Sequence, residues 1–282
     1  MQKMEDPKCC FAELHELIQT LEQSTNWNGD PLVKYEGFWF PLIVIFIAQS
    51  PLRTSNPHIV VPFLEYNIYR DHENPDLEHI PNPRIFSTHM PFNVLPDSIR
   101  ESECKIIYMC RNPLDHFISY RHFLLKKIIK EDVEPLGIDE SFDMFCQGIQ
   151  LFGPFWEHVL GYWNAHLKNP EKVLFLKYED LKENSTLYVK KIAEFIGLPF
   201  SSEEEEQGLI EEISKFCSFE NLSNLEVNKT GKLHGIVENS SFFRKGEIGD
   251  WKNYLTPEMA ERINKLMESQ LEGYGLKFKN KS

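Results

Sequence analysis

The chain has 282 residues, of which 41% are hydrophobic and 26% are charged. These fractions are close to those of ordinary globular domains, and they exclude a disordered chain, a collagen-like repeat and a disulfide scaffold. The chain carries 30 basic and 43 acidic residues, so its formal net charge is −13. Because an acidic surface repels phosphate backbones, nucleic acid is not an expected partner.

The N-terminal part predicts a helix over residues 11–21, where apolar side chains recur at helical spacing. Residues 24–35 are polar and are expected to form a loop, and an aromatic cluster follows at 35–40. The apolar run Leu42–Ala48 is shorter than the roughly 18 residues of a membrane helix and is typical of a buried strand. The N-terminus has no apolar run of signal-peptide type. We therefore expect a cytoplasmic protein without a membrane segment.

The six cysteines show no C-x-x-C spacing, and no other metal-ligand spacing occurs. The sequence therefore predicts reduced thiols and no bound metal. Neither of the two common glycine-rich phosphate motifs, G-x-x-x-x-G-K-[ST] and G-x-G-x-x-G, is present.

Three apolar runs predict strands that are buried on both faces, because they are continuous and rich in β-branched and aromatic residues. They are Pro83–His89, Lys105–Cys110 and Lys172–Tyr178. The second is followed by a helix that Asp115 can cap, and the third by a helix over Leu187–Ile196. Further helices are expected over 142–149, 154–167, 202–216 and 256–273. The third of these begins with a capping box at Ser202 and Glu205. This order predicts one α/β domain over residues 1–282, with an N-terminal helix and loop over 1–34 and a mostly parallel sheet.

Polar residues stand at the ends of the three predicted strands: His89, Arg111 and Tyr178. Ligands of parallel sheets bind outside the carboxyl ends of the strands, so these residues are candidates for a shared site. A neutral imidazole such as that of His89 suits general-base work. A purely structural role for this histidine remains open.

Two segments could bind an anion. Arg111 leaves a predicted strand and Ser119 lies in the following helix, a pair that can hold a phosphate. Arg244 and Lys245 precede Gly246, so two cations stand beside backbone amides that glycine leaves accessible. Each segment also has an interpretation without a bound anion. Arg111 could form a salt bridge with Asp115, and residues 244–246 could be a charged surface loop.

Taken together, these motifs resemble the cytosolic sulfotransferases, most closely the plant flavonol and steroid sulfotransferase-like branch. The resemblance begins near residue 35 and covers eight stretches in the family's order. They are 35–40 (YEGFWF), 61–65 (VPFLE), 86–91 (FSTHMP), 108–113 (YMCRNP), 153–156 (GPFW), 175–180 (FLKYED), 219–222 (FENL) and 243–246 (FRKG).

The resemblance implies a single-domain P-loop-like α/β fold and transfer of a sulfuryl group from 3′-phosphoadenylyl sulfate (PAPS) to the hydroxyl of a small phenolic or steroid-like acceptor. His89 matches the family's catalytic base. The residues that match contacts to the nucleotide are Arg111, Ser119, Tyr178, Phe219, Arg244, Lys245 and Gly246. The segment Lys252–Glu261 resembles the family's dimerisation motif, with Pro257 in place of the usual valine, and implies at most a weak homodimer.

The acceptor itself cannot be identified from the sequence. Aromatic residues from several segments are candidates for the walls of its pocket: Phe38, Trp39, Phe92, Tyr120, Phe152 and Phe155.

One part of the family's pattern is missing. The family carries a strand, a Pro-Lys-Ser-Gly-Thr-Thr-Trp loop and a helix before the segment that matches 61–65, whereas here residues 40–48 run almost directly into 50–58. The run Leu42–Ala48 could replace the strand, but it supplies no lysine and no glycine-rich turn for the 5′-phosphosulfate. Three hypotheses follow: a working sulfotransferase; an impaired or inactive member that at most binds the nucleotide or dimerises; and a product of an altered gene model or splice form that does not fold stably.

Overall fold

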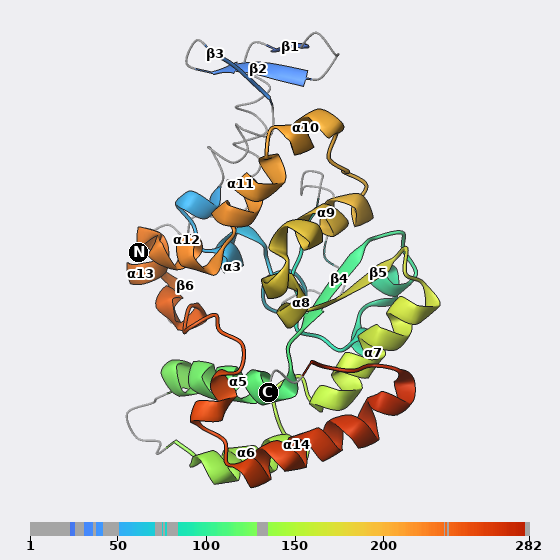
Figure 1. Cartoon of the computed structure of the whole chain (residues 1–282), viewed down its shortest axis with the longest axis vertical. Helices are drawn as coiled ribbons and strands as arrows, with labels where there is room; N and C mark the ends of the chain where they lie inside the picture. The colour runs from blue at the N-terminus through green and yellow to red at the C-terminus, as the bar shows by residue number, and fades with distance from the viewer. Residues whose placement is uncertain are drawn as a thin grey trace. The chain divides into compact units, whose positions relative to one another are not determined.

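Two parallel strands, β4 (Ile106–Cys110) and β5 (Val173–Lys177), form the sheet from which the candidate site is built (Figure 1). In this computed structural model the described residues are 23–25, 31–35, 38–41, 51–70, 75, 77, 84–128, 135–233, 235 and 237–279. The expected helix over 11–21 and the run Leu42–Ala48 lie outside these residues. Any structural replacement for the phosphosulfate loop at 42–50 therefore stays a prediction.

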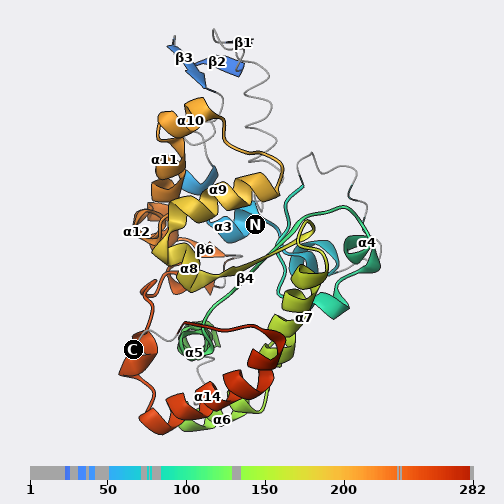
Figure 2. The same cartoon turned by 45° about the vertical axis from the view of Figure 1, so that its right-hand side comes forward.

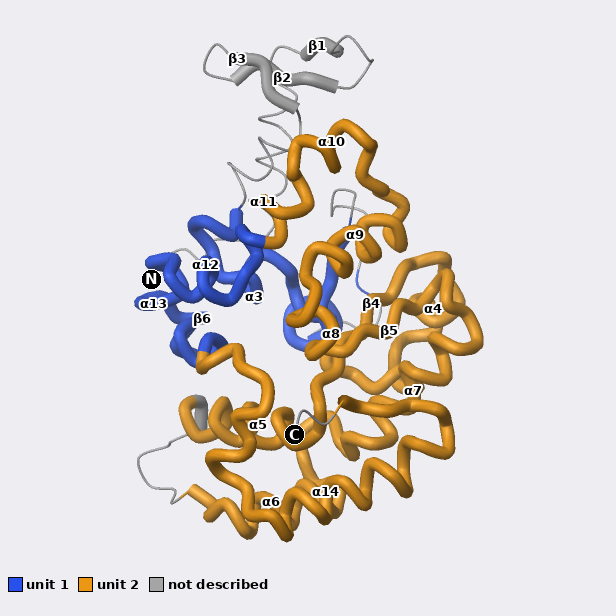
Figure 3. Tube along the Cα trace, in the orientation of Figure 1, with its two compact units in different colours: residues 1–88, 215–243 blue, residues 89–214, 244–282 orange. Residues whose placement is uncertain are grey.

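The chain divides into two compact units, which Figure 3 shows in different colours: residues 1–88 with 215–243, and residues 89–214 with 244–282. The second unit contains β4 and β5, and its other elements follow in chain order. They are η3 (Phe92–Val94), α4 (Asp97–Arg100), α5 (Pro113–Ile128), α6 (Ile138–Cys146), α7 (Phe155–Lys168), α8 (Tyr178–Glu183), α9 (Ser185–Phe195), α10 (Ser202–Glu206), α11 (Leu209–Phe216), η5 (Asp250–Asn253), α14 (Pro257–Gln270) and η6 (Glu272–Tyr274).

The core of the second unit is apolar and aromatic; α7 packs against β5, and α5, α6 and α14 pack against one another. Figure 2 shows α6 and α14 lying side by side. The side chains of Leu114, Val159, Val173, Ile263 and Leu271 are at most 1% exposed. They come from α5, α7, β5, α14 and the residue that follows α14, so the burial that stabilises this unit joins segments far apart in the sequence.

The first unit contains a three-stranded antiparallel sheet where a polar loop was expected. Its strands are β1 (Gln23–Thr25), β2 (Pro31–Tyr35) and β3 (Phe38–Pro41). Strand pairing depends on cross-strand partners more than on the composition of one strand, which is why the polar sequence did not reveal it. The other elements of this unit are η1 (Pro51–Arg53), α3 (Pro57–Val60), η2 (Leu64–Ile68), α12 (Phe219–Asn224), α13 (Glu226–Thr230), β6 (Lys232–Leu233), β7 (Val237–Glu238) and η4 (Asn239–Phe242).

The predicted strands at Lys105–Cys110 and Lys172–Tyr178 are confirmed, and they pair in parallel with Cys110 opposite Lys177. Of the run Pro83–His89 the structure describes residues 84–89, and these form only an isolated parallel bridge, between Ser87 and Phe63. Burial of β4 on both faces was a wrong prediction, since Ile107 and Met109 are 42% and 46% exposed. Side chains alternate along a strand, and in β4 one of the two faces is only partly covered.

Two helix caps differ from the sequence prediction. Helix α5 begins at Pro113, and the Leu114 N–H donates to Asn112 Oδ1 at 3.0 Å, so Asn112 and not Asp115 caps this helix. Proline is favoured at the first helical position, which moves the start three residues earlier. The capping box of α10 uses Ser201 and Glu204, one residue before the predicted pair. The predicted start of α14 is confirmed, because Thr256 Oγ1 accepts from the Met259 N–H.

Candidate nucleotide and acceptor site

Arg111 and Tyr178 lie side by side because β4 and β5 are parallel and in register. Each residue follows its strand directly, so the two side chains start from neighbouring positions at the carboxyl edge of the sheet. The Arg111 guanidinium carbon lies 4.8 Å from the centroid of the Tyr178 ring, a cation–π contact. Burial raises the pKa of the Tyr178 hydroxyl, although the nearby Arg111 charge acts in the opposite direction. This hydroxyl is therefore protonated at neutral pH and can donate.

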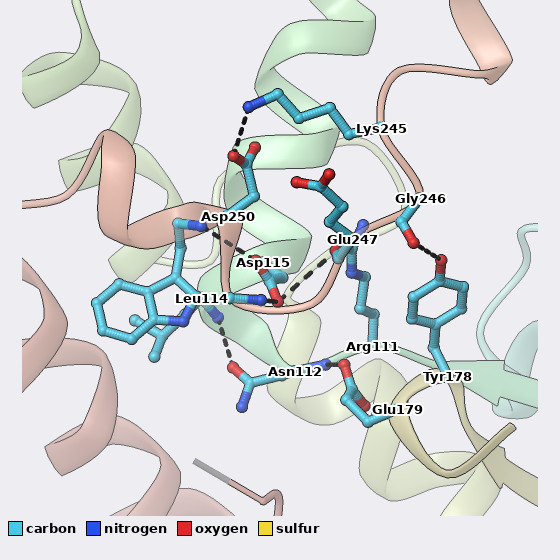
Figure 4. Close-up of polar contacts among 12 residues, drawn as sticks. Arg111, Asn112, Leu114, Asp115, Tyr178, Glu179, Lys245, Gly246, Glu247 and Asp250 are labelled. Atoms are coloured by element: carbon cyan, nitrogen blue, oxygen red, sulfur yellow. Dashed lines mark hydrogen bonds and ion pairs between the residues drawn. The ribbon is translucent and has the colours of Figure 1, made fainter. Parts of the chain in front are cut away.

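The loop before η5 is bound to both residues, although it lies more than 65 residues further along the chain (Figure 4). Tyr178 Oη donates to the Gly246 carbonyl at 3.1 Å, and Arg111 Nη2 donates to the Glu247 carbonyl. Gly246 has a φ of 65°, a backbone conformation that glycine adopts without strain. The structure thus brings Arg111 and Tyr178 together, as their positions at the strand ends predicted, and places the 244–246 segment beside them.

Asp115 holds this loop against the first turn of α5. Its side chain is buried, and its two carboxylate oxygens accept the Gly249 N–H at 2.7 Å and the Trp251 N–H at 3.1 Å. The Arg111 guanidinium is 3.8 Å away, so the expected ion pair exists alongside the contact of Arg111 with the loop. Asp115 was predicted as a helix cap, and its actual partners are more than 130 residues distant. Sequence spacing carried no signal for that contact.

Asp250 orients the two cations of the loop. Its carboxylate forms an ion pair with Lys245 at 2.7 Å (Figure 4). It also forms an ion pair with Arg244 and accepts from Asn253 Nδ2 at 2.9 Å. Burial alone would raise the pKa of the Asp250 carboxyl. Hydrogen bonds from Lys245, Arg244 and Asn253 outweigh that effect and hold the pKa well below its usual range. The carboxylate is therefore ionised throughout the neutral range. The sequence analysis did not select Asp250, although it lies in the same motif.

The site has hydrogen-bond donors that could bind an anion. The Nε atoms of both Arg111 and Arg244 are buried and have no hydrogen-bond partner among the described residues. Three cations, Arg111, Arg244 and Lys245, stand beside the two buried carboxylates of Asp115 and Asp250. Buried donors without a partner are costly, and a phosphate oxygen would satisfy them. The residues present therefore fit a phosphate-bearing ligand.

Two predicted nucleotide contacts are not connected to this cluster by any observed bond. Ser119 lies on α5, two helical turns beyond Arg111. Phe219 begins α12 in the first unit, where its ring lies 5.9 Å from that of Phe243. Both roles stay predictions.

His89 is exposed, and its ring stacks on Phe152 with centroids 5.2 Å apart and an interplanar angle of 16°. Phe152 is among the residues expected to line the acceptor pocket, so this contact places one of those aromatic rings against the candidate base. Phe152 has a φ of 59°, which a residue other than glycine adopts rarely. The other pocket candidates at Phe38 and Trp39 lie in β3, and nothing in the structure tests their role.

Two side chains of α7 hold the backbone at His89. The carbonyl of His89 can only accept, so His158 Nε2 donates to it at 3.0 Å, and His158 Nδ1 then accepts from Tyr108 Oη at 3.0 Å. Burial lowers the pKa of His158, which favours this neutral form. One turn later, Tyr162 Oη donates to the Met90 carbonyl at 2.7 Å. The sequence analysis missed His158 and Tyr162, although their i, i+4 spacing places both on one face of a helix.

If His89 is the base that the resemblance to sulfotransferases implies, replacing His158 by alanine is expected to lower kcat for sulfuryl transfer by about tenfold to 100-fold, because the His89 backbone loses its donor. Affinity for 3′-phosphoadenosine 5′-phosphate (PAP) should not change. Steady-state kinetics and calorimetry measure the two effects, and His158→Gln, which keeps a side-chain N–H donor, should restore part of kcat. The matched control is His166→Ala on the same helix, since His166 bonds to Val173 instead. A His158→Ala enzyme with unchanged kcat would show that this contact is not needed.

Among the described residues, no helix is long and apolar enough to cross a membrane. Within the same part of the chain, no three His, Cys, Asp or Glu side chains are grouped so that they could hold a metal ion.

Comparison with known proteins identifies the family. The model of the sulfotransferase domain matches residues 45–275. Cytosolic sulfotransferase 14 of Arabidopsis thaliana is 52% identical over 233 residues, which are 82% of this chain and 67% of that protein. Flavonol 3-sulfotransferase of Flaveria bidentis is 50% identical over 237 residues, 82% of this chain and 74% of that protein.

Solved structures give the same result. A mouse sulfotransferase complexed with PAP has a TM-score of 0.57 and 29% identity, and the match covers 69% of each chain. Retinol dehydratase in complex with androsterone and PAP has a TM-score of 0.59 and 25% identity, over 72% of this chain and 57% of that one. The shared fold is the P-loop-like α/β fold with a parallel sheet that the sequence predicted. By its sequence and its fold, this chain belongs to the plant cytosolic sulfotransferase family.

Proposed function

We propose that the protein transfers a sulfuryl group from PAPS to the hydroxyl of a small phenolic acceptor. One observation carries the nucleotide half of the proposal: Arg111 and the 244–246 loop meet at the sheet edge with buried guanidinium N–H groups still unpartnered. Support for the donor comes from structural neighbours that contain PAP. Support for a phenolic acceptor comes from relatives named as flavonol sulfotransferases. A steroid-like acceptor is the second candidate, since one neighbour contains androsterone.

In this proposal the residues of the chain divide the work. Arg111, Arg244, Lys245 and the Gly246 backbone hold the 3′-phosphate, and Asp250 keeps the two loop cations in place. When bound, PAPS supplies the sulfuryl group. His89 takes the proton from the acceptor hydroxyl, which is a poor nucleophile while it keeps that proton. His158 and Tyr162 fix the backbone that carries His89.

Ser119, Tyr178 and Phe219 complete the proposed nucleotide site. Ser119 adds a hydroxyl for the 3′-phosphate, and Tyr178 and Phe219 contact the adenine. A cytosolic location is proposed from the names of the relatives. A weak homodimer through Lys252–Glu261 is proposed from the motif in the sequence.

Calorimetric titration with PAP tests the nucleotide half without any assumption about the acceptor. The wild-type protein should bind, and Arg244→Ala should weaken binding by roughly 100-fold, because a buried charge-assisted contact of this kind contributes about 2–5 kcal/mol. Arg262→Ala is the matched control, because it removes the same charge from an exposed ion pair with Asp143 on α6. A protein that melts cooperatively but does not bind PAP would overturn the proposal. Equal binding by Arg244→Ala would overturn the assignment of the 3′-phosphate site.

The alternative is an impaired or inactive family member that binds the nucleotide or dimerises. The observation in its favour is the short stretch between residues 40 and 58, which contains no lysine and no glycine to cradle a 5′-phosphosulfate. A protein that binds PAP and transfers no labelled sulfate to any of a panel of flavonols and steroids would favour this alternative.

A further inference from the structure

A cavity of about 540 Å³ lies beside α5 in the second unit. Its walls come from α5, from α6 and from the segment 149–151. This volume falls within the range of about 300–1,000 Å³ that is usual for small-molecule sites. None of the residues assigned above to the nucleotide or to proton transfer lines it.

The cavity wall is mostly apolar. Phe117 and Leu124 contribute from α5 and Met144 from α6, while Ile149 and Leu151 are 54% and 59% exposed and therefore lie at the solvent side. Exposed leucine and isoleucine side chains around a cavity of this size are costly in water. A ligand with an aromatic or polycyclic body would cover them and recover that free energy.

Arg121 gives the cavity one positive charge. Its Nε donates to Ser141 Oγ at 3.0 Å and its Nη2 to the Leu136 carbonyl at 2.9 Å. These two bonds fix the guanidinium in place, and a guanidinium has five N–H donors, so others remain. Among the described residues no carboxylate forms an ion pair with Arg121. A fixed cation that has no counter-ion among the described residues, in an apolar cavity, favours a ligand with an anionic group.

The cavity is close to the candidate base but separate from it. Leu151 lines the cavity, and its N–H donates to Tyr120 Oη at 3.0 Å. The next residue, Phe152, turns away to stack on His89. His89 itself is not part of the wall. Tyr120, a candidate wall residue of the acceptor pocket, also lines this cavity, whereas neither Phe152 nor His89 does. The two sites would therefore share a wall residue, but a ligand in this cavity would not contact the candidate base.

We propose that this cavity is a second small-molecule site, which binds an aromatic anion such as an aromatic carboxylate, sulfonate or sulfate ester. The apolar wall contacts the ring system and Arg121 contacts the anionic group. The proposal does not depend on sulfuryl transfer, because neither the nucleotide nor His89 takes part.

Two fluorescent probes of similar size test it on the intact chain: 1-anilinonaphthalene-8-sulfonate, which is anionic, and N-phenyl-1-naphthylamine, which is neutral. Both should bind, and Ile149→Trp, which fills the solvent side of the cavity, should abolish binding of both. Arg121→Gln should raise the Kd of the sulfonate by roughly tenfold and leave that of the neutral probe unchanged.

The controls make the same changes elsewhere. Leu167→Trp places tryptophan at an exposed position of α7, and Lys265→Gln removes a charge from an exposed ion pair on α14. Neither should alter binding of either probe. Thermal melting shows that each variant is folded, and Leu151→Trp replaces Ile149→Trp if the latter is not. Binding that survives both tryptophan variants, or a sulfonate Kd that Arg121→Gln leaves unchanged, would overturn the proposal. Failure of PAP to bind would not affect it.

Discussion

Replacing His89 by alanine is expected to lower kcat for sulfuryl transfer by about 10²–10⁴-fold, the usual contribution of a positioned general base. The acceptor hydroxyl would then have to lose its proton to water while it attacks. Affinity for PAP should stay the same, because His89 contacts Phe152 and is absent from the network of Arg111, Asp115 and the 244–250 loop. Single-turnover kinetics with labelled donor and calorimetry with PAP measure the two quantities separately.

Imidazole added to the His89→Ala enzyme provides a control, since the exposed position leaves room for a free base to enter. We expect it to recover part of the lost rate. A variant that keeps a third or more of the wild-type kcat would show that another group takes the proton. A large loss of PAP affinity would show that His89 serves the nucleotide and would remove it from the acceptor site.

The free energy of unfolding is expected to fall by up to about 3 kcal/mol between pH 6.5 and pH 4 because of one histidine, His116 on α5. Burial lowers the pKa of His116 from 6.5 to about 4. A hydrogen bond with the Gln150 side chain opposes this shift, and the charges of Arg111 and His158 act in the same direction as burial. The Nε2 atom of His116 is buried, and its ring lies 4.7 Å from that of Phe155. The imidazole is therefore neutral in the folded protein at neutral pH.

The free energy of unfolding falls with falling pH because the unfolded chain binds the proton of His116 at a higher pH than the folded protein does. Below pH 6.5 the unfolded chain takes up a proton on His116, while the folded protein does not until the pH approaches 4. The stability that this residue contributes is thus complete above pH 6.5 and is lost as the pH falls towards 4. Urea unfolding at several pH values measures it.

The variant His116→Phe isolates this contribution, because it keeps a ring of similar size among Tyr120, Phe145 and Phe155 and cannot bind a proton. Over the same pH range the variant should lose less stability than the wild type, by up to about 3 kcal/mol. Parallel curves for the two proteins would contradict the lowered pKa. Burial also lowers the pKa of His158, and this acts equally in both proteins.

The sequence was sufficient for the elements whose signals are local. The apolar runs that became β4 and β5, the helices α5, α7, α9 and α14, and the Thr256 cap could all be predicted, because period and capping chemistry depend on neighbouring residues. The motifs that carry Arg111 and Arg244 also indicated the family, which the comparisons confirmed.

The sequence predictions were wrong where a residue type suits more than one role or where burial depends on distant segments. Asp115 is a good helix cap by composition, but Asn112 lies next to Pro113 and takes that role. The carboxylate of Asp115 is then available for the backbone of residues 249–251, a contact across more than 130 residues. The exposure of Ile107 and Met109 has a similar origin, since burial depends on what packs against a strand and not on the strand alone.

The sequence by itself determined the family, the parallel strand pair and the residues at the ends of its strands. Only the tertiary structure decided how those residues are held: Asp250 between two cations, His158 and Tyr162 on the backbone of His89 and Met90, and Arg121 in an apolar cavity. The physical reason is that secondary structure follows from short-range periodicity. Hydrogen bonds and ion pairs between distant segments depend instead on packing, and no pattern in the sequence specifies their distances.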